Sequence, residues 1–191
     1  MTKAIILLPL LMLAGCDSKP DIKATNASVG EVAAKVAAAR DEGDFMRPGK
    51  WQVKGFIDDI SIPGMPAGMA DKMKQQGQNM PGTQSCLTAA DVKKPGPDFF
   101  TGTKNCRYDH FSMVGGKVDA KMRCTSPRGI QTTAMAGEFG PEKYHMAMTT
   151  AMEDKAGAPA TGMEAMTMKL HVEGTRLGEC DAATAGKVAA K

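Results

Sequence analysis

Cysteine is the residue type in this sequence whose surroundings point most directly to a chemical reaction. Cys16, the first of five cysteines, follows Leu-Ala-Gly at the end of an apolar run, and Lys3 precedes that run. Bacterial enzymes that attach lipid to a cysteine sulfur recognise this small-residue pattern before the signal peptide is removed. We therefore predict a lipoprotein signal peptide over residues 1–15 and a lipid-modified Cys16 that anchors the protein to a membrane.

The other four cysteines are expected to form disulfides, because export delivers the chain to an oxidising compartment. Four cysteines allow three pairings. The expected strand positions favour Cys86 with Cys106 and Cys124 with Cys180. A zinc site is the alternative, but the chain has no Cys-x-x-Cys motif and only three histidines, so we predict no metal and no cofactor.

Groups that commonly act as acids, bases or nucleophiles do not form a recognisable catalytic set. His110, His145 and His171 are scattered along the chain and match no nucleophile or metalloprotease motif. Asp58 and Asp59 are adjacent, but neighbours on a strand point to opposite faces and so cannot act on one reacting centre. We therefore predict that the protein is not an enzyme.

Methionine is unusually frequent, with sixteen residues in a chain of 191. Thioethers together with imidazoles suit Cu(I), so a copper site is one interpretation. Within a strand, however, His145 would face away from Met146 and Met148. His171 would likewise face away from Met168. We therefore favour methionine as an adaptable core filler in a chain with few aromatic residues, and keep copper as the alternative.

Alternating apolar and charged residues predict a half-buried strand over residues 117–124. Residues 115–116 are both glycine, which is typical of a tight hairpin turn. Such a turn would place the apolar residues of both flanking strands on one face, but would also set Asp109 opposite Met122. A polar residue on the buried face indicates a β-bulge or a frayed strand end at this point.

Similar alternation recurs in several other segments and predicts the fold class. These segments are residues 51–62, 130–139, 143–148 and 166–172. They indicate a mainly β domain over residues 47–180, in which six or seven antiparallel strands form a meander that curls into a sandwich or a partly open barrel. Residues 181–191 are expected to form a disordered tail.

The segment between the lipidation site and the domain, residues 16–46, is expected to be a tether that contains one short helix. Residues 17–27 are polar and resemble a flexible spacer that contributes nothing to a core. Valines then recur at helical spacing among alanines, which predicts a helix from Ser28 to Arg40 with Ser28 as its N-cap.

A second short helix is predicted from Pro66 to Gln78, because Met69 and Met73 are spaced by one helical turn and Met65 lies one step earlier. This helix could cover a cleft as a lid or bind a partner, but capping the open end of the sheet is the favoured interpretation. Six methionines are the candidates for the cleft and its lid: Met65, Met69, Met73, Met122, Met148 and Met168.

Several short motifs occur in order between Arg47 and Cys180. They are Pro48-Gly49-Lys50-Trp51, Pro63-Gly64-Met65-Pro66, Cys86-Leu87-Thr88, Cys106, Gly115-Gly116, Cys124 and the closing Arg176, Gly178 and Cys180. Together they resemble a family of small exported Gram-negative proteins that carries a domain of unknown function, numbered three-six-one-seven. The resemblance implies a periplasmic or lipoprotein setting. It supplies no established activity and no functional residues, and it does not extend to the helical stretch before Arg47.

These observations lead us to expect an envelope binding or interaction protein, anchored by lipid on the periplasmic side of the inner or the outer membrane. A methionine-lined apolar cleft would bind a small hydrophobic ligand or another envelope protein. The alternative is a periplasmic Cu(I)-binding protein that uses methionine and histidine ligands. We expect no nucleic-acid partner, because 24 basic residues are scattered among 21 acidic ones without a basic run.

Overall fold

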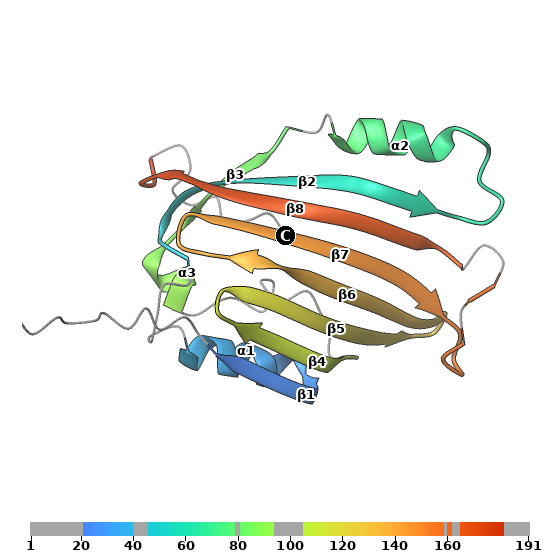
Figure 1. Cartoon of the computed structure of the whole chain (residues 1–191), viewed down its shortest axis with the longest axis horizontal. Coiled ribbons are helices and arrows are strands. Elements are labelled where there is room, and N and C mark those ends of the chain that lie inside the picture. The colour runs from blue at the N-terminus through green and yellow to red at the C-terminus, as the bar shows by residue number, and fades with distance from the viewer. Residues whose placement is uncertain are drawn as a thin grey trace, which may run out of the picture.

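The protein folds as one open antiparallel sheet of eight strands, with two longer helices near opposite edges (Figure 1). The computed structural model describes residues 21–39, 46–78, 81–93, 105–158, 160–161 and 165–181. The strands are β1 (Ile22–Ser28), β2 (Gly49–Ser61), β3 (Thr83–Leu87), β4 (Cys106–Val114), β5 (Lys117–Ser126), β6 (Gly129–Phe139), β7 (Lys143–Glu153) and β8 (Thr167–Gly178). The helices are α1 (Val29–Ala39), α2 (Met69–Gln78) and α3 (Ala89–Lys93). The predicted mainly β, antiparallel class is confirmed.

The strand order is β1-β4-β5-β6-β7-β8-β2-β3, so five consecutive strands, β4 to β8, form a meander where six or seven were predicted, and β2 joins it beside β8. The signal peptide predicted over residues 1–15, the lipidation site Cys16 and residues 182–191 of the predicted tail lie outside the described residues. Among the described residues, none of the helices has the length and apolar character needed to cross a bilayer.

The segment that we expected to be a flexible spacer forms part of the sheet instead. Residues 22–28 are strand β1, which pairs antiparallel with β4 along the edge of the sheet. Ile22 and Ala27 are buried in the core. Their side chains reach the same core although five positions separate them, because Asn26 adopts a left-handed backbone conformation (φ 48°) and interrupts the regular alternation.

Helix α1 begins at the residue that the sequence predicts. The Ser28 hydroxyl accepts a hydrogen bond from the Glu31 backbone N–H (3.2 Å), and the Glu31 carboxylate accepts one from the Ser28 N–H (2.6 Å). This reciprocal capping box satisfies two backbone donors at the start of the helix. Hydrogen bonding of the Glu31 carboxylate to Ser28, first to its backbone N–H and then to its side chain, lowers the pKa of Glu31 below its usual value because it favours the ionised form. Val32 and Val36 then point from α1 into the core.

The hairpin of β4 and β5 has the expected register next to its turn and a bulge farther away. Met113 lies opposite Val118, as predicted. The register shifts between Tyr108 and His110, so that Tyr108, rather than Asp109, lies opposite Met122. The bulge that the sequence indicated therefore removes the Asp109 side chain from the buried face.

That bulge also changes the disulfide pairing. Beyond it, Cys106 lies directly opposite Cys124, and the two form a disulfide. The predicted pairs, Cys86 with Cys106 and Cys124 with Cys180, are wrong because the prediction carried the unshifted register past the bulge. Cys86 is bonded to Cys180 instead. Strand β2 lies between β3 and β8 and pairs with both of them. Its residue Lys50 is opposite Cys86 on β3 and Gly178 at the end of β8, which brings Cys180 close to Cys86.

The densest core lies between α1 and the sheet edge formed by β1, β4 and β5. Fully buried side chains from all four elements meet there, with Met135, Phe139 and Met146 from the next two strands packed against their border. The buried set is Ile22, Ala27, Val32, Val36, Cys106, Tyr108, Phe111, Met113, Val118, Ala120 and Met122. Burial of this apolar surface is the main source of stability for a fold of this size.

Candidate functional site

The middle of the sheet presents a continuous apolar surface on the face to which α1 packs. Directly paired residues form a row across five strands: Ala120, Met135, Met148, Leu170 and Ile57. A second row runs parallel to it: Val118, Gly137, Met146, Val172 and Gly55. A third row ends in Thr150, Met168 and Ile60. Because paired residues share a face, all three rows lie on one side of the sheet.

We name the central part of these rows the methionine face, and define it as Met135, Met146, Met148, Met168, Leu170 and Val172. Each of these side chains is half-buried, whereas the intervening residues of β6 and β7, such as Ala136 and Thr149, are exposed on the opposite side. The period-two burial expected from the sequence therefore holds in β6 and β7. The methionine face continues the apolar side of the sheet from the border of the packed core toward β2.

The two longer helices border the methionine face. Helix α1 packs on β1 and β4, and α2 packs on β2 (Figure 1). The contact of α2 is close, because a Cβ on the buried Gly77 would lie 3.1 Å from the Ile57 side chain. Ile57 is paired with Leu170 of the methionine face. Strand β3 pairs only with Gly49–Val53, so α2 takes the place of a strand along the rest of β2.

The six predicted methionines do not all come together. Met148 and Met168 lie on the methionine face. Met122 is 4% exposed and belongs to the core beneath α1 instead. Met69 and Met73 lie on α2, where Met69 is 45% exposed and Met73 is half-buried, and Met65 precedes that helix. Met135 and Met146 were missed, although the alternation of their segments could have identified them.

Aromatic residues close one end of the methionine face. Tyr144 lies over Gly174, where a Cβ would overlap its ring, and its ring centroid is 5.9 Å from that of the buried Trp51. Burial raises the pKa of the Tyr144 hydroxyl above its ordinary value. Glycine at position 174 is therefore required for the ring to pack flat on the sheet.

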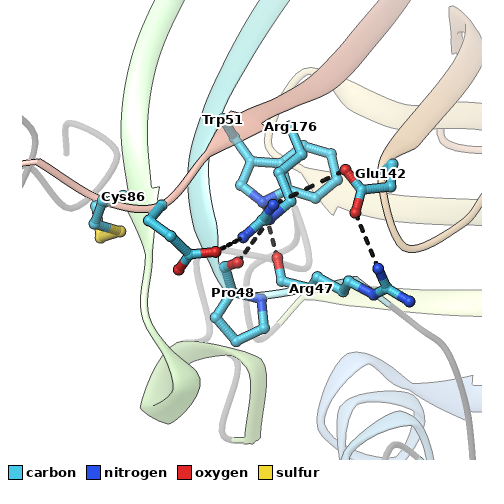
Figure 2. A network of polar contacts seen from close by, with 8 residues as sticks. Arg47, Pro48, Trp51, Cys86, Glu142 and Arg176 are labelled. Atoms are coloured by element: carbon cyan, nitrogen blue, oxygen red, sulfur yellow. Dashed lines mark hydrogen bonds and ion pairs between the residues drawn. A yellow bond between two sulfur atoms is a disulfide. The ribbon is translucent and has the colours of Figure 1, made fainter.

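The residues that carry the family resemblance form a structural network at this end of the sheet (Figure 2). The Trp51 indole N–H donates to the Arg47 carbonyl (3.0 Å), and the Arg176 Nε donates to the Pro48 carbonyl (2.8 Å). Glu142 pairs with Arg47 (3.3 Å) and with Arg176 (4.0 Å). The Cys86 disulfide lies beside this network, and the short sequence motifs thus hold together the ends of β2, β3 and β8.

Two open pockets lie beside the sheet, and no residue of the methionine face lines either of them. One open pocket of about 510 Å³ lies at the β6–β7 turn and is lined by Glu138, Tyr144, His145 and Glu173, among others. Another of about 510 Å³ lies beside Cys106 and Pro127. The lid and the cleft expected at the methionine face remain predictions.

The three histidines, His110, His145 and His171, all lie on the polar side of the sheet. His145 and His171 alternate with the methionines of their own strands, as expected. The prediction that Asp58 and Asp59 point to opposite faces is wrong, however, because β2 has a register shift between Ile57 and Asp59. Asp58 lies 2.7 Å from the His171 Nδ1, and Asp59 lies 3.8 Å from the Lys169 Nζ. Both carboxylates therefore reach the same face, which the rule of strict alternation did not allow.

Fold and surface together define a small disulfide-bonded β protein with one fully packed and one half-buried apolar region. Residues 46–180 match the family described as "Protein of unknown function (DUF3617)", and the chain belongs to this family. The matched segment begins after α1, so β1 and α1, which contribute to the sheet and its core, lie outside it. No curated protein and no solved structure matches the chain.

Proposed function

We propose that this protein is a lipid-anchored binding protein of the bacterial cell envelope, and that its methionine face binds the hydrocarbon chain of a small hydrophobic ligand. The observation that carries the proposal is the set of paired rows that continue from the packed core across β6, β7 and β8. Their side chains stay half-buried between the two bordering helices. Large contiguous apolar surfaces on soluble proteins usually mark binding sites.

Methionine supports an acyl chain as the occupant. Its unbranched thioether side chain adopts many conformations and so fits flexible apolar partners at low cost. Met146 and Met148 alternate on one strand, and Met135 lies directly opposite Met148, so the thioethers form a cluster that can rearrange together. A protein held at a membrane by Cys16, as the sequence predicts, would be close to a supply of acyl chains.

Replacement of two neighbouring residues on the methionine face tests this proposal. Met148 and Leu170 are paired, and Met148→Gln with Leu170→Gln would make the centre of the face polar at nearly constant volume. The matched control is Thr149→Gln with Lys169→Gln, which alters the pair directly beside them on the opposite side. Binding of a fluorescent long-chain fatty acid is measured by titration for all three proteins.

We expect the parent chain and the control to bind the probe equally, and the double variant of the methionine face to lose at least tenfold in affinity. Two buried apolar side chains are worth about 1.5–3 kcal/mol each, and a tenfold loss corresponds to about 1.4 kcal/mol. Equal binding by all three proteins, or no binding by the parent chain, would refute the acyl-chain proposal. Circular dichroism establishes that each variant is folded.

Cu(I) binding is the second candidate, because Met135 and Met148 are directly paired and Met146 lies on the same face. The histidines lie on the other side of the sheet, so a site here would use thioether ligands alone. Competition with a colorimetric Cu(I) chelator under reducing conditions distinguishes the two candidates. A Met148→Leu variant would lose copper but would still bind the fatty acid.

A further inference from the structure

Two of the three histidines come together on the polar side of β7 and β8. His145 lies directly opposite Glu173, and His171 precedes Glu173 by two positions on the same strand. One ligand atom from each of these residues lies within 4.8 Å of the other two. Atoms bound to one zinc ion at 2.0–2.2 Å are roughly 3.3 Å apart, so a small movement of exposed side chains would complete the geometry.

His171 is already held in the orientation that a metal ligand requires. Its Nδ1 lies 2.7 Å from the Asp58 carboxylate, and its ring stacks on Phe56 with centroids 4.6 Å apart. When the carboxylate accepts a hydrogen bond from the Nδ1–H group, the Nε2 atom carries the free lone pair. Metal-binding histidines almost always have such a carboxylate or carbonyl partner on the second nitrogen. The bulge in β2 places Asp58 there.

The surroundings of the cluster leave room for an ion and further ligands. His145 and Glu173 line the pocket of about 510 Å³ at the β6–β7 turn, together with Glu138, which is paired with His145. The His145 and His171 rings are 5.5 Å apart and inclined by 35°. Three protein donors, two of which line an open pocket, correspond to the arrangement of zinc sites that keep one position for water.

We propose that His145, His171 and Glu173 bind one divalent transition-metal ion of the zinc type, with Asp58 as the residue that positions His171. Two imidazoles and one carboxylate are borderline and hard donors, which suit Zn²⁺ and its first-row neighbours and do not suit Cu(I). This site lies on the opposite side of the sheet from the methionine face. Its existence does not depend on the proposed acyl-chain binding.

The test is calorimetric titration of the full chain with Zn²⁺ after treatment with a chelator. A Cys16→Ser background removes the one cysteine that lies outside the two disulfides. We expect one Zn²⁺ per chain in the presence of excess Mg²⁺. His145→Ala, which alters an exposed side chain, should weaken binding by more than about 100-fold, beyond the 10-fold to 100-fold range of outer-shell changes.

His110 provides a matched control. It also lies on the polar side of the sheet and also contacts a carboxylate, with Nε2 2.7 Å from Asp119, but it belongs to the β4–β5 hairpin. His110→Ala should therefore leave Zn²⁺ affinity unchanged. Loss of binding in His110→Ala equal to that in His145→Ala would show surface adsorption and overturn the proposal, as would a parent chain that binds no Zn²⁺.

Asp58→Asn separates positioning from direct binding. The amide oxygen can still accept from Nδ1 but is neutral, so the His171 imidazole becomes a weaker donor. We expect Zn²⁺ affinity to fall by about 10-fold to 100-fold and the visible absorption of the Co²⁺-substituted protein to shift, while unfolding of the metal-free chain stays the same. Unchanged affinity and absorption would refute the assigned role of Asp58.

Discussion

The same face of the sheet is tightly packed at one edge and only half-buried in the middle. At the β1–β4–β5 edge, α1 covers Tyr108, Phe111 and Met122, which are almost fully buried. Two strands farther on, Met148 and Leu170 point in the same direction but are only half-buried. The residue types are similar in the two regions, so the difference comes from the covering helix and not from the strands themselves.

This comparison shows that apolar residues at every second position of a strand specify the face to which their side chains point, but not whether those side chains are buried. A strand residue that points to the apolar face is buried only when another element packs on it. The region beneath α1 therefore acts as the core that stabilises the sheet, whereas the methionine face is the surface to which we assign the proposed ligand. Each region also has its own disulfide, Cys106–Cys124 beneath α1 and Cys86–Cys180 near Tyr144 and Trp51.

Removal of the disulfides should produce the largest effect and should differ between the two regions. Cys86 and Cys180 are separated by 94 positions, whereas Cys106 and Cys124 are separated by 18. Chain-entropy reasoning predicts a loss of about 4.5 kcal/mol for Cys86→Ser with Cys180→Ser and about 3 kcal/mol for Cys106→Ser with Cys124→Ser. Urea unfolding of the two double variants measures both values. The reverse order would show that native packing, and not loop length, determines their contributions.

Methionine truncation in each region should give the next largest difference. Met122→Ala creates a cavity beneath α1 and should cost about 3 kcal/mol. Met148→Ala removes a half-buried side chain and should cost about 1 kcal/mol. Thr149→Ala, on the exposed side, should stay within about 0.5 kcal/mol of the parent in the same unfolding assay. Equal losses for Met122→Ala and Met148→Ala would mean that the methionine face is part of the packed core.

The smallest effect is expected at the start of the covering helix. Ser28→Ala removes the capping hydroxyl and should lower the free energy of unfolding by about 1 kcal/mol. Ser28→Thr keeps a hydroxyl and should retain most of this stabilisation. Because the capping box lowers the Glu31 pKa, its stabilisation is present above the unfolded pKa of that carboxyl and is lost as the pH falls through the lowered value. The difference between parent and Glu31→Ala, which removes the carboxylate, should therefore narrow on acidification, as urea unfolding at neutral pH and at about pH 3 would show. A constant difference would contradict the reciprocal bond.

Much of the meander was predictable because its signals are local. The Gly115-Gly116 turn and the alternation of β5 specify the hairpin register near the turn, and the valine spacing with Ser28 specifies α1. The pairing of the cysteines was not predictable, because it depends on a bulge near Asp109 that shifts the register by one residue. A shift of one residue reverses the side-chain direction of everything beyond it.

Two further features were missed for related reasons. Strand β1 was hidden because the left-handed Asn26 breaks its alternation, so Ile22 and Ala27 do not share a parity. The histidine cluster was hidden because His145 and His171 are joined by a long connection whose register the sequence does not specify. The sequence did show that both histidines alternate with the methionines of their strands and so point to the same, polar face of the sheet. This was the one signal in the sequence for a common site.

The early start of β1 restricts where an anchored molecule can work. With lipid on Cys16, as proposed, only the five residues 17–21 separate the acylated sulfur from Ile22. Even a fully stretched peptide of that length reaches roughly 18 Å. The edge of the sheet must then remain close to the headgroups of its own leaflet, and the protein could not carry a ligand across the aqueous space to a second membrane without leaving its anchor.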